Sequence, residues 1–222
     1  MGVTFDIKGQ SAVITGGAGV LCAAMCRALV EAGARVAVLD LRAESAEALA
    51  AELGENAIGL ACDVLNKASI EAAAQKILQA FTKVDILING AGGNKPQATA
   101  NSEQSFFDLP ADALRWVFDL NLMGTVLPSQ VFGKIMAEQK NGVIINISSM
   151  NAFRPLTRIA AYSAAKAGVS NFTQWLAVHM AQEYSPAIRV NAIAPGFFLT
   201  EQNRFLLTEK NSGELTARGR SI

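Results

Sequence analysis

Tyr162 and Lys166 are the residues of this sequence whose types and spacing point most directly to acid–base chemistry. They stand four positions apart in a predicted helix, so their side chains project from one face of it. An ammonium beside a phenol favours the phenolate, and we therefore expect the pKa of Tyr162 to fall from its free value of about 10 towards neutrality. At such a pKa a phenol can exchange a proton with an alcohol or a carbonyl. Ser149 follows a predicted strand and is expected to hydrogen-bond the same oxygen.

A glycine-rich turn, residues 15–22, separates the first predicted strand from the first predicted helix. At such a place glycines let the backbone approach a pyrophosphate, and the helix N-terminus supplies free N–H groups. The motif is imperfect, because Val20 and Cys22 stand where further glycines would help, and the alternative is a tight turn that only packs. The residues of this turn that we predict to bind a dinucleotide are Gly16, Gly17, Gly19, Val20 and Leu21.

Acidic and small residues stand where the next predicted strands end. Asp40 closes the second strand, where a carboxylate can accept hydrogen bonds from both ribose hydroxyls of an adenosine and would repel a 2′-phosphate. It therefore favours NAD over NADP, a preference that the nearby Arg42 weakens without reversing. The other strand-end residues that we predict to bind the cofactor are Asp63, Val64, Asn89, Gly90, Ala91 and Gly92. For Asp40 and Asp63, the alternative is an acid that only caps the following helix.

Apolar runs of strand length alternate with amphipathic stretches of helix length along the chain. The predicted strands are residues 11–15, 35–40, 57–62, 84–89, 142–148 and 188–194. The predicted helices are residues 20–32, 43–53, 67–81, 111–138 with an interruption near Pro128, and 162–183. Continuously apolar strands between such helices predict a parallel sheet covered on both faces, and right-handed crossovers favour a doubly wound, Rossmann-type, three-layer α/β fold. No linker or repeat divides residues 1–222, so we predict a single domain whose part after about residue 205 is irregular.

Composition narrows the possible partners and locations. The 222 residues are 51% hydrophobic and carry 19 Lys and Arg against 19 Asp and Glu. Such a balanced, apolar composition excludes global disorder and gives no electrostatic reason to expect nucleic acid or an anionic membrane. No apolar run approaches the roughly 18 residues of a membrane span, and the N-terminus lacks the pattern of a secretory signal, so we expect a cytoplasmic protein. Three cysteines and one histidine argue against a disulfide scaffold and a zinc site, and we predict no metal.

Taken in order, these motifs resemble those of the short-chain dehydrogenase/reductase family over residues 7–205. The resemblance implies a catalytic set of Ser149, Tyr162 and Lys166. It also implies that Tyr162 and Lys166 bind the cofactor, with Lys166 holding the nicotinamide ribose. It implies further that Asn121 interrupts the fourth helix and holds a proton-relay water. The segment that flanks the nicotinamide in the family is matched by Pro195, Gly196 and Thr200. The family also implies a homodimer or homotetramer that packs through its fourth and fifth helices.

Within that family, several stretches are similar to the branch that interconverts D-fructuronate and D-mannonate. These stretches are residues 16–22, 88–94, 148–153 and 195–204. The resemblance implies NAD(H)-dependent hydride transfer between a keto sugar acid and its hydroxy acid. The predicted substrate-binding residues are Asn94, Asn151, Gln202, Asn203 and Arg204. Arg204 is the preferred clamp because a guanidinium matches a carboxylate in bidentate geometry, whereas Arg154 and Arg158 are expected to be solvated surface charges.

Two other functions are compatible with the sequence. A 3-oxoacyl thioester reductase would require a cationic patch for its carrier and would usually use NADPH. Asp40 argues against NADPH. A nucleotide-sensing protein would keep the fold without turnover, although sensing needs no acid–base group such as Tyr162. The family usually continues past this length with a further helix and a seventh strand, so we expect the sheet to lack that last strand. The sixth strand would then form an exposed apolar edge.

Overall fold

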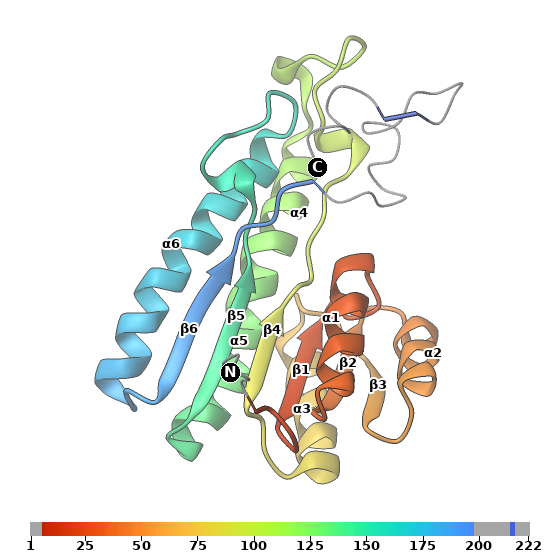
Figure 1. The fold of residues 1–222 in the computed structure, drawn as a ribbon. Coiled ribbons are helices and arrows are strands. Elements are labelled where there is room, and N and C mark those ends of the chain that lie inside the picture. The colour runs from red at the N-terminus through yellow and green to blue at the C-terminus, as the bar shows by residue number, and fades with distance from the viewer. Residues whose placement is uncertain (1–5, 198–213, 216–222) are drawn as a thin grey trace.

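Six parallel strands form one sheet in the computed structural model, which describes residues 6–197 and 214–215 (Figure 1). In space the strands follow the order β3-β2-β1-β4-β5-β6. The strands that follow β1 in the sequence therefore lie on one side of the central β1–β4 pair, and those that follow β4 lie on the other. The strands are β1 (Ser11–Thr15), β2 (Arg35–Asp40), β3 (Ala57–Ala61), β4 (Ile86–Asn89), β5 (Gly142–Ile147) and β6 (Ile188–Ile193). Every pairing between neighbours is parallel, which confirms the predicted doubly wound α/β fold.

Helices lie on both faces of the sheet (Figure 1). The α-helices are α1 (Val20–Glu31), α2 (Ala43–Leu53), α3 (Lys67–Phe81), α4 (Ala111–Phe118), α5 (Gly124–Gln139) and α6 (Ala160–Glu183). The short turns are η1 (Pro96–Ala98), η2 (Phe106–Asp108) and η4 (Met150–Ala152), with the π-helical turn η3 (Asp119–Met123) between α4 and α5. One hydrophobic cluster contains residues of α1 and α2, and another contains residues of α3, α5 and α6, so these two sets cover opposite faces.

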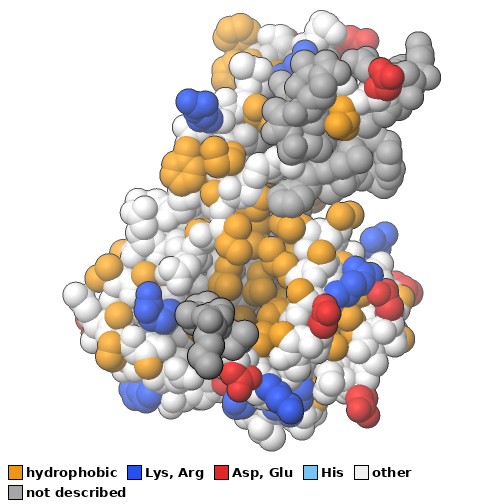
Figure 2. Space-filling model, in the orientation of Figure 1, with side chains coloured by type: hydrophobic (Ala, Val, Ile, Leu, Met, Phe, Trp, Pro, Cys, Tyr) orange, Lys and Arg blue, Asp and Glu red, His pale blue; other side chains and the backbone are white. Residues whose placement is uncertain are grey.

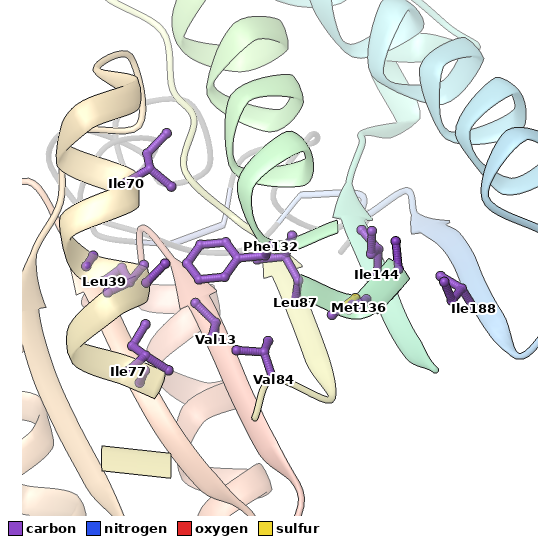
Figure 3. Packing of buried hydrophobic residues seen from close by; sticks show 14 of the residues in the cluster. Val13, Leu39, Ile70, Ile77, Val84, Leu87, Phe132, Met136, Ile144 and Ile188 are labelled. Atoms are coloured by element: carbon purple, nitrogen blue, oxygen red, sulfur yellow. The ribbon is translucent and has the colours of Figure 1, made fainter. Parts of the chain in front are cut away.

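The larger hydrophobic core lies between the sheet and α3, α5 and α6 (Figure 3). Phe132 and Met136, one turn apart on α5, are fully buried there, and Phe132 lies beside Leu87 of β4. Ile70 and Ile77 present the apolar face of α3 to the same cluster. Burial of one large apolar side chain typically contributes about 1.5–3 kcal/mol, so this cluster fixes α3 and α5 against the strands whose ends carry the candidate residues.

The opposite face is covered over β1 and β2, but no helix of the described residues covers it over β5 and β6. Figure 2 shows hydrophobic side chains gathered in a hollow near the middle of this face, beside α1. Along β6, buried Ile188 and Val190 alternate with exposed Arg189 and Asn191. Within the described residues β6 stands at the end of the strand order, as predicted. The predicted arrangement with helices on both faces is present, and two successive right-handed crossovers place α5 and α6 together on one of them.

The long fourth helix predicted from the sequence is interrupted, but at a different place. The break is the π-helical turn Asp119–Met123, at whose centre Asn121 stands, as the family resemblance implied. There the Asn121 amide donates to the Val117 carbonyl and the Thr125 hydroxyl donates to the Asn121 carbonyl, which satisfies backbone groups that the turn leaves without their usual partners. The predicted break near Pro128 is wrong, because this proline lies inside α5 near its start, where its missing N–H costs a single hydrogen bond.

Candidate active site

The glycine-rich turn after β1 and the loop after β4 meet at the carboxyl edge of the sheet. Gly16 has a φ of 62°, a left-handed conformation that residues with a side chain rarely adopt. A Cβ on Gly16 would lie 2.8 Å from the Cα of Ala91, so the two segments touch through their backbones. The Thr15 hydroxyl fixes this contact, because its Oγ1 accepts hydrogen bonds from the N–H groups of Gly90 at 3.1 Å and Ala91 at 3.2 Å.

The N-terminus of α1 lies at this edge without a capping side chain. Gly19 occupies the N-cap position, makes no side-chain hydrogen bond, and is followed by a first turn that holds no acidic residue. The first N–H groups of the helix and its positive dipole end therefore remain available to an anion such as a diphosphate. Val20 is 60% exposed and Leu21 is half-buried beside this terminus. The backbone of the turn thus fits the predicted dinucleotide site.

Asp40 and Asp63, at the ends of neighbouring strands, have different surroundings. Asp40 is half-buried, and its carboxylate accepts 3.3 Å hydrogen bonds from the N–H groups of Ala18 and Arg42. This places the carboxylate beside the glycine-rich turn, where a ribose is expected. The Asp63 carboxylate instead accepts a 2.9 Å hydrogen bond from the N–H of Leu65, which closes its own loop. Asp40 is therefore the better placed of the two predicted acids.

Ser149, Tyr162 and Lys166 come together between β5 and the first turns of α6. The Lys166 side chain is buried, its Nζ donates a 2.7 Å hydrogen bond to the Ile147 carbonyl, and the same atom lies 5.7 Å from the centre of the Tyr162 ring. The Ser149 hydroxyl lies beside the Tyr162 phenol and lowers its pKa in part, and it accepts a 3.2 Å hydrogen bond from the Asn151 N–H. Tyr162 and Lys166 thus project from one face of α6, as their spacing predicted.

Burial, rather than the neighbouring ammonium, dominates the acidity of the phenol. It raises the pKa of Tyr162 above its usual value, and the hydrogen bond with Ser149 lowers that pKa only in part. The predicted lowering by Lys166 is wrong for this structure, because the ammonium donates to the Ile147 carbonyl instead. Burial also lowers the pKa of Lys166 to about 8, an effect that the nearby Cys22 thiol opposes. The phenol is therefore protonated at neutral pH and can donate a proton.

Asn121 joins the π-helical turn to the loop after β4. Its Nδ2 donates to the Gly93 carbonyl at 2.7 Å, and its Oδ1 accepts from the Gly93 N–H at 3.2 Å. Gly92 leaves the space that this arrangement needs, because a Cβ there would lie 2.7 Å from Asn121 Oδ1 and 3.3 Å from Lys166 Nζ. Asn121 and Lys166 therefore flank the same glycine, and the four residues of the implied acid–base set share one region.

Asn89, a predicted cofactor-binding residue, has its side chain in a buried polar network beneath this edge. The residue is 1% exposed, and its Nδ2 donates to Ser129 Oγ at 2.9 Å and to Asn146 Oδ1 at 2.8 Å. The Asn146 amide donates in turn to the Thr173 hydroxyl at 2.9 Å. This network ties β4 and β5 to α5 and α6. The structure therefore gives the Asn89 side chain a supporting position and leaves only its backbone near the loop that lines the site.

The remaining predicted residues are divided between the described part of the chain and its undescribed end. Asn94 and Asn151 are half-buried after β4 and β5, and the Asn94 amide donates to the Thr99 hydroxyl at 2.8 Å. The Pro195 carbonyl accepts a 3.0 Å hydrogen bond from the Met150 N–H, which holds the segment after β6 beside the one after β5. Gly17 and Val64 are buried, Gly196 follows Pro195, and Arg154 and Arg158 are exposed as expected. Four predicted residues lie outside the described residues: Thr200, Gln202, Asn203 and Arg204.

Lys95 is a candidate that the sequence reasoning missed. Its Nζ lies 4.8 Å from the centre of the Trp116 ring of α4, and no ion pair involves it within the part of the chain that the structure describes. The same helix packs Ala113 and Val117 against Tyr162, so the Lys95 ammonium lies beside a helix that borders the candidate site. A lysine in a loop has no periodicity to mark it, and its place directly after Asn94 was the only available signal.

The described residues include the chain's three cysteines. Within the described residues there is no group of three His, Cys, Asp or Glu side chains that could hold a metal ion. All three cysteines are buried, and burial raises the pKa of Cys22 to about 11, of Cys26 to about 12 and of Cys62 to about 11. Residues 6–197 and 214–215 also contain no helix with the length and hydrophobicity that a membrane crossing requires.

A doubly wound sheet with a glycine-rich turn after its first strand and a serine–tyrosine–lysine set after its fifth defines a dehydrogenase or reductase. The chain belongs to the short chain dehydrogenase family, whose model matches residues 10–211. It is therefore an oxidoreductase, and the resemblance inferred from the motifs is confirmed.

Three relatives are similar over most of the chain. The uncharacterized oxidoreductase UxuB of Bacillus subtilis (strain 168) is 47% identical over 98% of this chain and 81% of that protein. D-threitol dehydrogenase of Mycolicibacterium smegmatis is 39% identical over 90% of this chain and 75% of that protein. The structure of a provisionally assigned D-mannonate oxidoreductase from Haemophilus influenza with bound NAD superposes with a TM-score of 0.88 at 43% identity, over 97% of this chain and 80% of that one.

Proposed function

We propose that this chain catalyses NAD(H)-dependent hydride transfer between a keto sugar acid and its hydroxy acid, with D-fructuronate and D-mannonate as the pair. The observation that carries the proposal is the contiguity of the serine–tyrosine–lysine set with Asn121 at an edge where glycines leave backbone surface free. The likeness to the NAD-bound Haemophilus protein supports the same cofactor, and the substrate assigned to that protein supports a sugar acid.

The residues at this edge fit a nicotinamide dinucleotide. The N-terminus of α1 and the turn from Gly16 to Gly19 would hold its diphosphate, because uncapped N–H groups attract an anion. Asp40 would accept hydrogen bonds from the adenosine ribose and would repel a 2′-phosphate, which favours NAD over NADP. Lys166 would hold the nicotinamide ribose, as the family resemblance implies. When bound, the nicotinamide supplies or accepts the hydride.

Tyr162 is the proton donor when the carbonyl is reduced and the proton acceptor in the reverse direction. Its raised pKa keeps the phenol protonated before reduction. Ser149 lies beside that phenol, whose pKa it lowers in part, and would align the substrate oxygen there. Lys166 Nζ lies 5.7 Å from the centre of the Tyr162 ring and donates to the Ile147 carbonyl, so its part in turnover is to hold the nicotinamide ribose next to the phenol. Asn121 holds the bordering loop through Gly93 and supports the proton relay.

A substrate panel tests this function directly. The chain is mixed with NADH and, in separate reactions, with keto sugar acids, neutral keto sugars or acetoacetyl thioesters, and NADH oxidation is followed by absorbance with NADPH in parallel. We expect turnover with D-fructuronate and NADH. Turnover only with thioesters and NADPH would instead identify a 3-oxoacyl thioester reductase. Binding of NADH without turnover of any compound would favour a nucleotide-sensing protein.

We also propose that Lys95 binds the carboxylate of the substrate. A Lys95→Met substitution is expected to raise the KM for D-fructuronate about tenfold, because one charge-assisted contact is lost. The KM for a neutral keto sugar is expected to stay unchanged, which serves as the internal control. An Arg204→Ala variant measured alongside tests the clamp that the sequence predicted. An unchanged KM for D-fructuronate in Lys95→Met, with a raised KM in Arg204→Ala, would contradict the assignment to Lys95.

We propose a homodimer or homotetramer that forms through α5 and α6. A groove of about 830 Å³ lies between these helices, and Trp175 stacks there between Phe172 and His179. Trp175 is 57% exposed, and large exposed aromatic surface favours a protein contact. A Trp175→Glu substitution is expected to lower the mass measured by light scattering to that of one chain, whereas an unchanged oligomer would place the contact elsewhere.

A cytoplasmic location stays a proposal drawn from the sequence.

A further inference from the structure

Cys22 and Gly90 are two departures from the family's usual motifs, and the structure places them against each other. Cys22 stands in the glycine-rich turn where a further glycine would help, and Gly90 is the second residue of a segment that resembles Asn-Asn-Ala-Gly. A Cβ on Gly90 would overlap the Cys22 sulfur and would also come within 2.9 Å of the Thr15 carbonyl oxygen. The thiol therefore occupies the space that a side chain at position 90 would need.

Both residues belong to segments that border the candidate cofactor site. Cys22 is 4% exposed in the first turn of α1, whose uncapped N-terminus fits a diphosphate. Gly90 begins the loop after β4, whose next residue, Ala91, touches Gly16 through the backbone. The Thr15 hydroxyl accepts a hydrogen bond from the Gly90 N–H on one side of this loop. The Cys22 thiol packs against the same residue and thereby sets how closely α1 and the loop can approach.

We propose that Cys22 is a positioning residue for the cofactor, because its thiol and the missing side chain at Gly90 together set the separation between the N-terminus of α1 and the loop after β4. The inference rests on the proposed NAD(H) site. Interiors are packed too closely to absorb an extra methyl group without displacement, so a side chain at position 90 must displace the Cys22 sulfur, and a smaller residue at position 22 relieves that part of the overlap. The two positions are therefore expected to be energetically coupled.

A double-mutant cycle tests this coupling by fluorescence titration of NADH, with thermal unfolding measured in parallel. Gly90→Ala alone is expected to weaken NADH binding about tenfold, since its new Cβ meets the Cys22 sulfur. The double variant, Cys22→Gly with Gly90→Ala, loses the overlap with the sulfur but keeps the contact with the Thr15 carbonyl oxygen, so it is expected to bind NADH at least about threefold more tightly than Gly90→Ala alone. Gly133→Ala is the matched control, because a Cβ at this buried helical glycine would meet the Met180 and Ile144 side chains only at ordinary contact distances of 3.8 and 3.9 Å. It should leave NADH affinity unchanged.

The outcomes separate positioning from a purely structural role. For Gly90→Ala we expect the KM for NADH to rise more than kcat falls, because the displaced segments would hold the cofactor without contacting the reacting carbonyl. A double variant that binds NADH as weakly as Gly90→Ala would overturn the proposal. If Gly90→Ala does not fold, Cys22→Gly alone is expected to weaken NADH binding severalfold, and an unchanged affinity would overturn it. A wild-type chain that binds no NADH would instead refute the proposed function.

Discussion

Replacing Tyr162 with phenylalanine is expected to lower the kcat of keto acid reduction about a thousandfold. The substitution removes only the phenol oxygen, which lies beside Ser149 and is the proposed proton donor. The ring keeps its packing against Ala98, Ala113 and Val117, so we expect the free energy of unfolding to change by no more than about 1 kcal/mol. Steady-state kinetics with D-fructuronate and NADH measure the loss.

Tyr184→Phe is the matched control for that experiment, because Tyr184 is the other of the chain's two tyrosines. It lies 44% exposed directly after α6, away from the serine–tyrosine–lysine set, and its substitution should leave kcat unchanged. The affinity of Tyr162→Phe for NADH should stay within about threefold of the wild type, since Tyr162 is only one of many predicted cofactor-binding residues and its ring remains. A Tyr162→Phe variant that keeps more than about a tenth of the wild-type kcat would contradict the assignment.

Lys166→Met is expected to reduce kcat/KM about a hundredfold or more, yet leave the protein at least as stable at pH 7. The lowering of the Lys166 pKa from 10.5 to about 8 corresponds to a cost of about 3 kcal/mol for keeping the charge buried. The lost hydrogen bond to the Ile147 carbonyl costs about 1 kcal/mol in return. Kinetics, NADH titration and urea unfolding of the variant check these three expectations. A clearly destabilised variant would show that the ammonium serves the fold.

The same substitution should change how stability depends on pH. The folded pKa of Lys166, about 8, lies below its unfolded value of 10.5, so between these two values the unfolded chain binds more protons than the native one. Under that condition the free energy of unfolding rises with pH. We therefore expect the wild type to gain stability relative to Lys166→Met from pH 8 to pH 10.5.

Much of the fold could be predicted because its strands are continuously apolar and its crossovers have one hand. A parallel, doubly wound sheet follows from these two properties, and the predicted strand bounds differ little from those observed. The interruption of the fourth helix could not be located from Pro128, because a proline near a helix start is tolerated and the side-chain hydrogen bonds of Asn121 decide where the helix widens. The uncovered face over β5 and β6 likewise depends on which side each crossover takes.

The sequence predicted which residues form the site better than it predicted the pKa values of their side chains. Spacing along one helix was enough to pair Tyr162 with Lys166, because that pairing is a local property of α6. The direction of the Tyr162 pKa depends on enclosure by residues distant in sequence, including Ala98 and Val117, which spacing does not encode. The contact between Cys22 and Gly90 also joins residues that are distant in sequence. Each residue taken alone is only a departure from the family's usual motif and does not indicate the contact.

Deuterium transfer tests the central claim most directly, because it follows the hydride rather than the loss of absorbance. The wild-type chain is incubated with D-fructuronate and NADH that carries deuterium at both positions of the reduced nicotinamide carbon, and the product is analysed by mass spectrometry. We expect D-mannonate that carries one deuterium, and almost none of it from Tyr162→Phe in the same time. Unlabelled product, or no product from a chain that binds NADH, would contradict the proposed hydride transfer.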